Sequence, residues 1–266
     1  MKWLLAFPLA AASETAQRCD FEVVQADKLR PGFENEYTHP ILIQGTPWNR
    51  EQASLASFRR VFGNYTVRLT RNLEFQSRAG VKPEANTSTY DAWADSLFHQ
   101  ESVPYVFEFC NRDLCQQIES TFGIPTYLKN SCLSLYLNTG TVAKGVAFHQ
   151  HRQTWGWLLA GQKVWYVAPP GTLPFQPHRH VEEGKLQRSS VQRCFQEEGE
   201  IVFLPQDWWH ATFNKAEWNL AIGGQGDISS NAFEAVRGAD AAKIRKLPKE
   251  EIKGVLQSAV ENGHGE

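Results

Sequence analysis

The 266-residue sequence has no Cys-x-x-Cys pair, no block of basic residues and, beyond its first residues, no long apolar stretch. Without a Cys-x-x-Cys pair, a thioredoxin-like redox site and a zinc ribbon are excluded. Without a basic block, nucleic acid is not expected as a partner. Because a bilayer-spanning helix needs roughly 20 apolar residues, we expect no membrane span. Internal repeats and low-complexity tracts are also missing from the sequence.

The composition is that of a globular protein. Hydrophobic residues make up 42% of the chain and charged residues 21%, with a formal net charge of −2. The length suits one large domain or two small ones. Nine tryptophans are many for this length, and several lie close to the histidines described below. They indicate either core packing or an aromatic-lined pocket.

The amino terminus has the pattern of a signal peptide, which we expect over residues 1–16. Lys2 supplies a positive charge, residues 3–12 are apolar, and the small residues needed for cleavage follow at 10–12. Entry into the secretory pathway agrees with two glycosylation sequons, at Asn64 and Asn86. The five cysteines could then form disulfides, and Cys110 and Cys115 are a local candidate pair. Because the count is odd, at least one thiol is free or paired with another chain.

A His-x-His pair, His149 and His151, is the strongest chemical signal in the sequence. Side chains two residues apart on a β-strand leave the same face, so both imidazoles can enter one cavity. His210 follows the strand-like run 201–204 and a proline, where a third ligand from another strand would arrive. Three converging imidazoles suit zinc, copper, nickel or iron. The sequence therefore predicts a metal site at His149, His151 and His210.

Apolar periodicity divides the rest of the chain into three parts. Residues 17–130 combine the apolar spacing of helices with that of strands. We expect them to form an α/β segment that packs on a barrel. We expect strands there at 39–45, 65–69 and 105–109 and helices at 53–62, 90–98 and 111–123. Residues 131–226 have only the β pattern, with a turn at 138–140 and a long polar insertion at 172–198 that contains His178 and His180. Residues 227–266 form a tail whose amphipathic helix, Pro248 to Val260, would cover the barrel or make a homodimer.

The β half resembles a cupin. Gly199, Pro205, His210 and Asn214 fit the spacing of the second cupin motif. More specifically, two stretches resemble the JmjC branch of the 2-oxoglutarate oxygenases: Phe148 through Trp165 with the following Pro-Pro pair, and the run from Phe203 to Thr212. The resemblance covers most of residues 18–224. It implies a mainly β fold with flanking helices, built on a double-stranded β-helix of the cupin or jelly-roll type.

The resemblance also implies roles for particular residues. His149 and His210 match the iron-binding histidines, and Lys163 matches the lysine that pairs with the distal carboxylate of 2-oxoglutarate. Tyr136 and Asn214 complete the implied cofactor-binding set, so the implied cofactors are Fe(II) and 2-oxoglutarate.

Two positions depart from the wider family. It usually has Asp or Glu where this chain has His151, although a lumenal subgroup also carries histidine there. Related hydroxylases often have threonine at the position of Val146. The lumenal subgroup implies residence in the endoplasmic reticulum lumen.

Three readings of the function stay open at this point. The first is an Fe(II)- and 2-oxoglutarate-dependent hydroxylase of protein side chains in the secretory pathway. The second is a non-catalytic module of the same fold that binds a partner protein, with an aromatic rim of Trp155, Trp157, Trp208 and Trp209 as the contact surface. The third is a three-histidine cupin that acts on a small molecule.

Overall fold

The computed structural model describes residues 18–70, 86–97, 105–129, 134–142, 144–172 and 191–226. The expected signal peptide, the polar segment with His178 and His180, and the carboxyl-terminal helix with its homodimer contact lie outside these ranges. None of the helices within them is long and apolar enough to cross a membrane.

Thirteen strands and three α-helices are assigned in the described ranges. The strands are β1 (Glu22–Gln25), β2 (Ile41–Gln44), β3 (Thr66–Thr70), β4 (Asn86–Thr89), β5 (Tyr105–Phe109), β6 (Ser134–Gly140), β7 (Gly145–His149), β8 (Thr154–Ala160), β9 (Lys163–Ala168), β10 (Gln192–Gln196), β11 (Ile201–Leu204), β12 (Trp209–Asn214) and β13 (Asn219–Gln225). The helices are α2 (Leu55–Phe62), α3 (Tyr90–Ser96) and α4 (Arg112–Phe122), with 3-10 turns η1 (Ala26–Lys28) and η2 (Phe33–Asn35).

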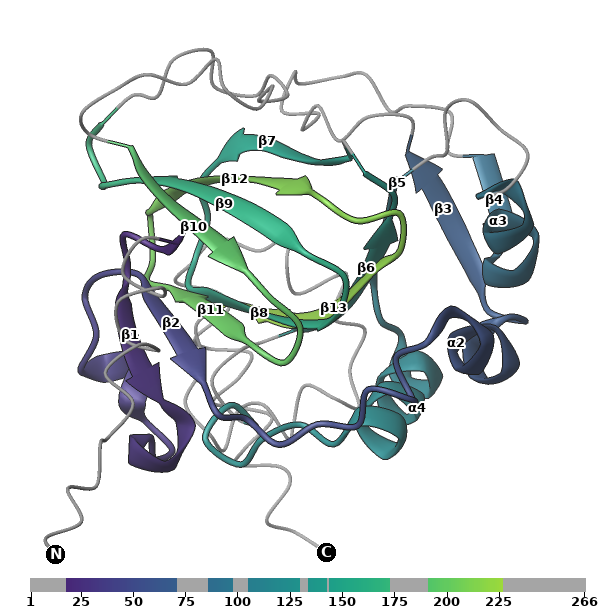
Figure 1. Cartoon of the computed structure of the whole chain (residues 1–266), viewed down its shortest axis with the longest axis horizontal. Helices are drawn as coiled ribbons and strands as arrows, with labels where there is room; N and C mark the ends of the chain where they lie inside the picture. Colours follow the sequence, from purple (N-terminus) through teal and green to yellow (C-terminus); the bar gives the residue numbers. More distant parts are fainter. Residues whose placement is uncertain are drawn as a thin grey trace, which may run out of the picture.

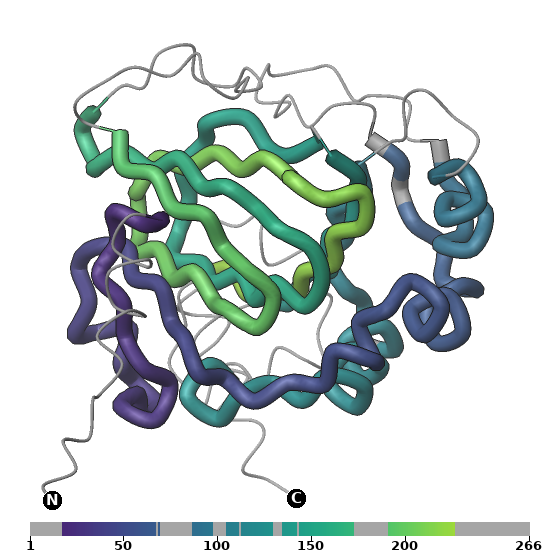
Figure 2. Tube along the Cα trace, viewed as in Figure 1, coloured from purple at the N-terminus to yellow at the C-terminus, as the bar shows by residue number. Residues whose placement is uncertain are grey.

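The strands form two sheets that face each other (Figure 1). The larger sheet has the order β1-β2-β11-β8-β13-β6-β5-β3-β4, and the smaller one has the order β10-β9-β12-β7. Apart from the parallel β1–β2 pair, the pairings are antiparallel. The expected mainly β class with flanking helices is therefore confirmed. Figure 2 shows the amino-terminal segment (purple) beside strands near the end of the described chain (green), and β2 pairs with β11 there.

The three α-helices begin where the sequence supplies a capping side chain. The side chains of Ser54, Thr89 and Asn111 each accept a hydrogen bond from the backbone N–H three residues later, which satisfies one of the free donors at a helix start. α2 and α4 each bury one apolar face in the main core, where Phe62 stacks on Phe122 with ring centroids 5.8 Å apart. The helices therefore lie outside the larger sheet (Figure 1) and leave the space between the sheets open for other side chains.

Two disulfides hold the fold. Cys110 and Cys115 are bonded, as expected from their spacing. Cys19 is bonded to Cys194 on β10, across a sequence separation of 175 residues. Beside it, both guanidinium ends of Arg18 donate to the carboxylate of Glu200 at 2.7 and 2.9 Å. The amino-terminal segment is thus linked to β10 and to the residue that precedes β11.

Three details of the sequence interpretation were wrong. The expected turn at 138–140 is the end of β6, because Asn138 and Thr139 pair with both β5 and β13 and are buried. The expected insertion at 172–198 contains β10, which is paired with β9 through its whole length. β7 ends at His149, so His151 lies just beyond the strand.

Candidate metal centre

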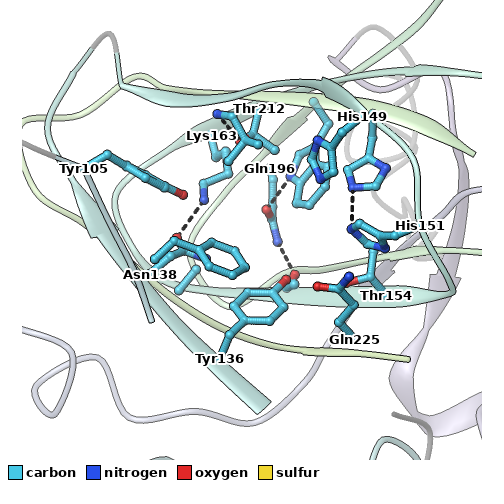
Figure 3. Close-up of a pocket in the computed structure, with 16 residues that line it drawn as sticks. Tyr105, Tyr136, Asn138, His149, His151, Thr154, Lys163, Gln196, Thr212 and Gln225 are labelled. Carbon is cyan, nitrogen blue, oxygen red and sulfur yellow. Dashed lines mark hydrogen bonds between the residues drawn. The ribbon is translucent and has the colours of Figure 1, made fainter. Parts of the chain in front are cut away.

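A pocket lies between the two sheets and receives side chains from both. The larger sheet contributes residues of β5, β6, β8 and β13, and the smaller sheet contributes residues of β7, β9, β10 and β12. Its lining consists of Tyr105, Phe107, Tyr136, Asn138, Val146, His149, His151, Thr154, Gly156, Lys163, Trp165, Gln196, His210, Thr212, Ala221 and Gln225 (Figure 3). No carboxylate is present in this lining, as far as the structure describes it.

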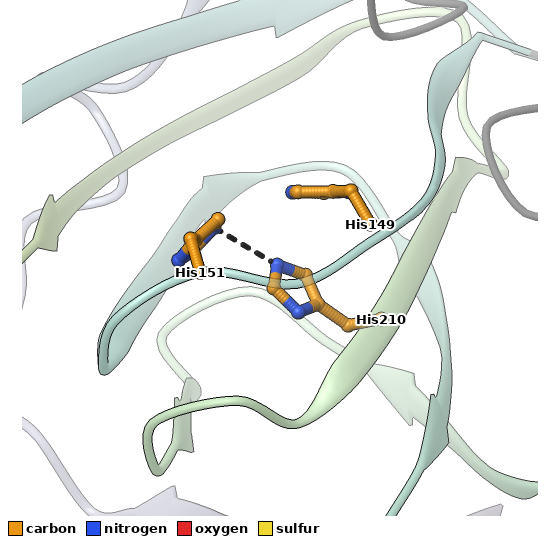
Figure 4. A group of neighbouring side chains, drawn as sticks. All are labelled: His149, His151 and His210. Carbon is orange, nitrogen blue, oxygen red and sulfur yellow. Dashed lines mark hydrogen bonds between the residues drawn. The ribbon is translucent and has the colours of Figure 1, made fainter. Parts of the chain in front are cut away.

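The three predicted metal ligands meet at one end of the pocket (Figure 4). His149 and His210 are directly opposite each other on the paired strands β7 and β12, which brings their ring centroids to 4.1 Å. His151 follows β7, and its backbone carbonyl accepts a hydrogen bond from Asp207 N at 2.9 Å. Asp207 has a left-handed backbone (φ 64°), a strained conformation for a residue other than glycine. One potential ligand nitrogen from each ring lies within 4.8 Å of the others.

Each imidazole is oriented by the backbone. Nδ1 of His149 lies 2.8 Å from the Ala147 carbonyl oxygen. Nδ1 of His151 lies 2.6 Å from the Arg152 carbonyl oxygen, and Nδ1 of His210 lies 2.9 Å from the Trp208 carbonyl oxygen. A carbonyl oxygen can only accept, so each Nδ1 is assigned the ring proton. Each neutral ring therefore presents an Nε2 lone pair to the pocket, as metal-ligating histidines do.

Burial keeps the rings of His151 and His210 neutral. It lowers the pKa of His151 from 6.5 to about 4, although the hydrogen bond to the Arg152 carbonyl opposes the shift. It also lowers the pKa of His210 well below the ordinary value, with further lowering by His149 and His151. A metal ligand must be a neutral imidazole, so these two rings are ready to bind an ion at neutral pH.

The spacing of the triad fits one metal ion. Nε2 of His210 and Nε2 of His151 are 3.1 Å apart. Two nitrogens that share an ion at about 2.0–2.1 Å are roughly 3 Å apart when the bond angle is near 90°. Two lone pairs facing each other at this distance repel unless a cation lies between them. His149, His151 and His210 therefore fit a divalent transition metal.

Lys163 lies at the other end of the same pocket (Figure 3). Only 2% of the residue is exposed, so it is not a solvated hairpin lysine. Nζ donates to Oδ1 of Asn138 at 3.0 Å and lies 6.0 Å from the centre of the Tyr105 ring. Burial lowers the pKa of Lys163 from 10.5 to about 7. A buried amine whose acceptor is a neutral amide fits the carboxylate of an acidic small molecule.

The other two predicted cofactor-binding residues are placed differently. Tyr136 lines the pocket, and its hydroxyl donates to the Trp155 carbonyl oxygen at 3.0 Å. Gly223 makes room for it, because a Cβ there would collide with the Tyr136 ring. Asn214 is fully buried and lies opposite Lys163 in the β12–β9 register, but it does not line the pocket. Within the described ranges, both polar atoms of its side chain lack a hydrogen-bond partner.

Several pocket residues were not predicted from the sequence. Thr212 is two residues after His210 on β12, and Asn138 is two residues after Tyr136 on β6. Counting in twos along each strand would have found both. Thr212 is paired with Val146, whose N–H donates to the Thr212 hydroxyl at 3.2 Å. The hydroxyl that the resemblance places at position 146 is thus present on the neighbouring strand. Gln196 gave no such signal, because β10 has no apolar alternation.

The four tryptophans of the expected aromatic rim do not form an exposed surface. Trp155 and Trp157 are fully buried, because their side chains pack in the main core. Trp209 is 9% exposed. Trp208 is partly exposed, and its Nε1 donates to the Thr38 carbonyl oxygen at 3.2 Å.

The two predicted glycosylation sites lie toward opposite ends of the β3–β4 pair. Asn64 is exposed in the turn between α2 and β3. Asn86 is the first residue of β4, which pairs with β3.

The chain is similar in sequence to several known proteins. No family model matches the chain. The chain is 31% identical to JmjC domain-containing protein 8 of Mus musculus over 221 residues, which is 77% of this chain and 82% of the relative. It is 25% identical to the Homo sapiens protein of the same name over 240 residues, 80% of this chain and 85% of the relative. It is also 20% identical to the bifunctional arginine demethylase and lysyl-hydroxylase psr-1 of Caenorhabditis elegans over 255 residues, 81% of this chain and 62% of the relative.

These relatives agree with the structure. Three relatives named JmjC domain-containing protein 8 match most of the chain, two of them at 31% identity. The residues that carried the resemblance also converge, because His149, His151 and His210 form one group at the pocket end opposite Lys163. Sequence similarity and site geometry thus lead to the same assignment: the chain belongs to the JmjC family.

Proposed function

We propose that the chain is a JmjC-type oxygenase that uses Fe(II) and 2-oxoglutarate to hydroxylate a protein side chain in the secretory pathway. Within the family we propose that it is a counterpart of JmjC domain-containing protein 8, and that its two sheets form a double-stranded β-helix. The observation that carries the proposal is the position of the histidine triad and Lys163 at opposite ends of one pocket.

Each pocket residue has a role in this proposal. His149, His151 and His210 would hold Fe(II) through Nε2, since each Nδ1 is held by a carbonyl oxygen. Lys163 would pair with the distal carboxylate of 2-oxoglutarate, and Asn138 keeps its amine directed into the pocket. When bound, Fe(II) and 2-oxoglutarate supply the chemistry that converts O2 and a C–H bond into a C–OH group, with release of succinate and CO2. Buried aromatic walls, such as Trp165 and Tyr136, exclude water from this space.

The disulfides support a location in the secretory pathway. The described fold contains two disulfides, and structural disulfides persist in oxidising compartments. The exposed position of Asn64 also suits a glycan. We propose the endoplasmic reticulum lumen. Mass spectrometry of the protein from secretory cells tests this, because an unmodified Asn64 and Asn86 together with an intact residue 1 would argue against it.

One experiment tests the reaction. The purified chain is supplied with Fe(II), 2-oxoglutarate and O2, with secretory-pathway proteins as candidate substrates, and succinate is measured. We expect succinate formation that disappears in His210→Ala. Succinate formation that is equal in the wild type and His210→Ala would contradict the proposal.

A second candidate function is a non-catalytic module that binds a partner protein. It is favoured by His151, which occupies the position where the wider family has a carboxylate. The two candidates differ in metal content. If the chain is a non-catalytic module, it should bind no divalent transition metal between pH 6 and 8.

A further inference from the structure

The two disulfides differ in how easily a thiol from another molecule can reach them. Cys19 and Cys194 are 4% and 0% exposed, and both pack in an apolar cluster. Cys110 and Cys115 are both partly exposed, and Asn111 between them is exposed. Thiol–disulfide exchange requires a thiolate to reach a sulfur atom of the bond, so exposed disulfides exchange more readily than enclosed ones. The Cys110–Cys115 bond is therefore the more accessible of the two.

The fold around this bond is held by other contacts as well. Cys110 directly follows β5, and its N–H donates to the Leu135 carbonyl oxygen at 3.1 Å. The Asn111 side chain caps α4 and accepts a hydrogen bond from Leu114 N at 2.9 Å. Leu114 and Ile118 bury one face of α4 in the main core. Because the bond closes a loop of only 5 residues, opening it frees little chain, and we expect β5 and α4 to stay in place.

The start of α4 favours release of one of the two sulfur atoms. Cys115 is the fourth residue of α4, and its N–H donates to the Asn111 carbonyl oxygen at 2.9 Å. It lies in the first turn, where the partial positive charge of the helix amino terminus stabilises an anion. A Cys115 thiolate is therefore a good leaving group. Attack of an incoming thiolate on the sulfur of Cys110 is thus the favoured direction of exchange.

We propose that the Cys110–Cys115 pair is a thiol–disulfide exchange site whose partner is a protein dithiol. A thiolate of the partner attacks Cys110 Sγ, the bond between the two cysteines breaks, and Cys115 leaves as a thiolate that takes up a proton. The second thiol of the partner then attacks the mixed disulfide and releases Cys110 as a thiol. The pair gains two electrons and two protons, and the dithiol becomes a disulfide; the reverse reaction oxidises the pair. The site is independent of the proposed oxygenase reaction.

The short loop is the reason for a dithiol rather than a single thiol. After the first step, Cys115 is only five residues from the mixed disulfide on Cys110. Closing so short a loop costs little entropy, so Cys115 returns to Cys110 and expels a monothiol. A second thiol on the partner attacks intramolecularly and competes with this return. We therefore expect net reduction by dithiols and no accumulation of mixed disulfides with monothiols.

The test follows both disulfides in the folded full chain. The wild type is treated with dithiothreitol in the absence of denaturant and quenched by alkylation at intervals, and mass spectrometry assigns the reduced cysteines. We expect the Cys110–Cys115 bond to open on the order of 10-fold faster than the Cys19–Cys194 bond or more, at a rate proportional to dithiothreitol. Circular dichroism should stay unchanged at that stage. Reduction of both pairs together, or of Cys19–Cys194 first, would overturn the proposal.

The reverse reaction uses the same samples. After removal of dithiothreitol, its oxidised form should restore the Cys110–Cys115 bond without forming other pairs. Cys132→Ser removes the fifth cysteine of the sequence and should change neither rate. Rates that depend on Cys132 would assign the exchange to that thiol and contradict the proposal.

Two matched variants trap the first step. Cys115→Ser leaves Cys110 without its partner, and Cys194→Ser leaves Cys19 without its partner. With oxidised glutathione, Cys115→Ser should form a stoichiometric mixed disulfide at Cys110, with release of one reduced glutathione. Folded Cys194→Ser should form little at Cys19, which is 4% exposed. Equal trapping by both folded variants would contradict the proposal. The wild-type rates decide the question if Cys194→Ser does not fold.

Discussion

The Nε2 atom of His210 lies 3.1 Å from the Nε2 atom of His151, while Nδ1 of each ring faces a backbone carbonyl oxygen. The backbone therefore keeps two lone pairs directed at one point. The protein maintains this arrangement by pairing β12 with β7 and by the hydrogen bond from Asp207 N to the His151 carbonyl oxygen. A cation at that point would remove the repulsion between the lone pairs, and this makes metal binding the first property to test.

His210→Ala should abolish binding of a divalent transition metal. The two remaining histidines come from one segment, and two ligands make a poor site. Isothermal titration calorimetry with Zn(II) measures the loss. His39→Ala is the matched control, because His39 is exposed and contacts Glu22 rather than the triad. A His210→Ala protein that binds Zn(II) as tightly as the His39→Ala protein would show that the triad is not the site.

The metal-free protein should lose stability as the pH falls below 6.5. The folded state holds the pKa of His151 at about 4 because of burial, whereas the unfolded chain has the ordinary value of 6.5. Between these values the unfolded chain binds the additional proton, so the free energy of unfolding decreases, by about 2 kcal/mol at pH 5 for this residue. Urea unfolding between pH 8 and 4.5 measures it. His151→Gln cannot titrate and should show a shallower dependence; an unchanged dependence would contradict the assignment.

His151→Asp should increase 2-oxoglutarate turnover if the chain is an oxygenase. The aspartate restores the two-histidine, one-carboxylate ligand set typical of such enzymes and lowers the charge of the metal site. Succinate formation should increase at least several-fold. Asparagine has nearly the same size as aspartate but no charge, so His151→Asn should give no increase in succinate formation. Similar rates for the Asp and Asn variants would show that charge at this position does not limit the reaction.

Binding of 2-oxoglutarate should be accompanied by proton uptake near and above pH 7. Burial lowers the pKa of Lys163 to about 7, so part of the population is neutral at that pH. A carboxylate beside the amine favours the ammonium form and raises the pKa again. Calorimetry in two buffers with different heats of ionisation counts the protons. Lys163→Met should take up none at this site, and equal uptake by the variant and the wild type would assign the proton to another group.

The Cys19–Cys194 disulfide should stabilise the protein more than the Cys110–Cys115 disulfide. In the chain-entropy model, a loop of 175 residues restricts the unfolded chain by about 5 kcal/mol and a loop of 5 residues by about 2 kcal/mol. Urea unfolding of Cys19→Ser/Cys194→Ser and of Cys110→Ser/Cys115→Ser compares them. Equal losses, or a larger loss for the short loop, would contradict this order.

The sequence could predict the His-x-His pair because its chemistry depends on local spacing, and His149 and His151 are two residues apart. A period of two therefore predicts which side chains share a face. The starts of the three α-helices depend on local sequence in the same way, because each is capped by a side chain that directly precedes the helix. The role of Lys163 came from the resemblance to the JmjC branch.

Long-range features could not be predicted by the same reasoning. Five cysteines allow many pairings, and nothing near Cys19 indicates Cys194 as its partner. Asn138 and Thr139 read as a turn with Gly140, but pairing with strands on both sides extends β6 through them. The burial of Trp155 and Trp157 also depends on core residues that are distant in sequence, such as Ile43 and Ile222. In each case a contact distant in sequence outweighs the local preference.

The bond between Cys19 and Cys194 has a consequence for how the protein is made. Chains are synthesised from the amino terminus, so Cys19 emerges long before its partner and β1 cannot be fastened until β10 has been translated. During that interval Cys19 is a free thiol, and Cys110 and Cys115 appear as competing partners. Any early disulfide between Cys19 and one of these thiols must be exchanged before Cys19 can pair with Cys194. A thiol–disulfide isomerase should shorten the maturation of this protein more than that of one whose cysteines pair locally.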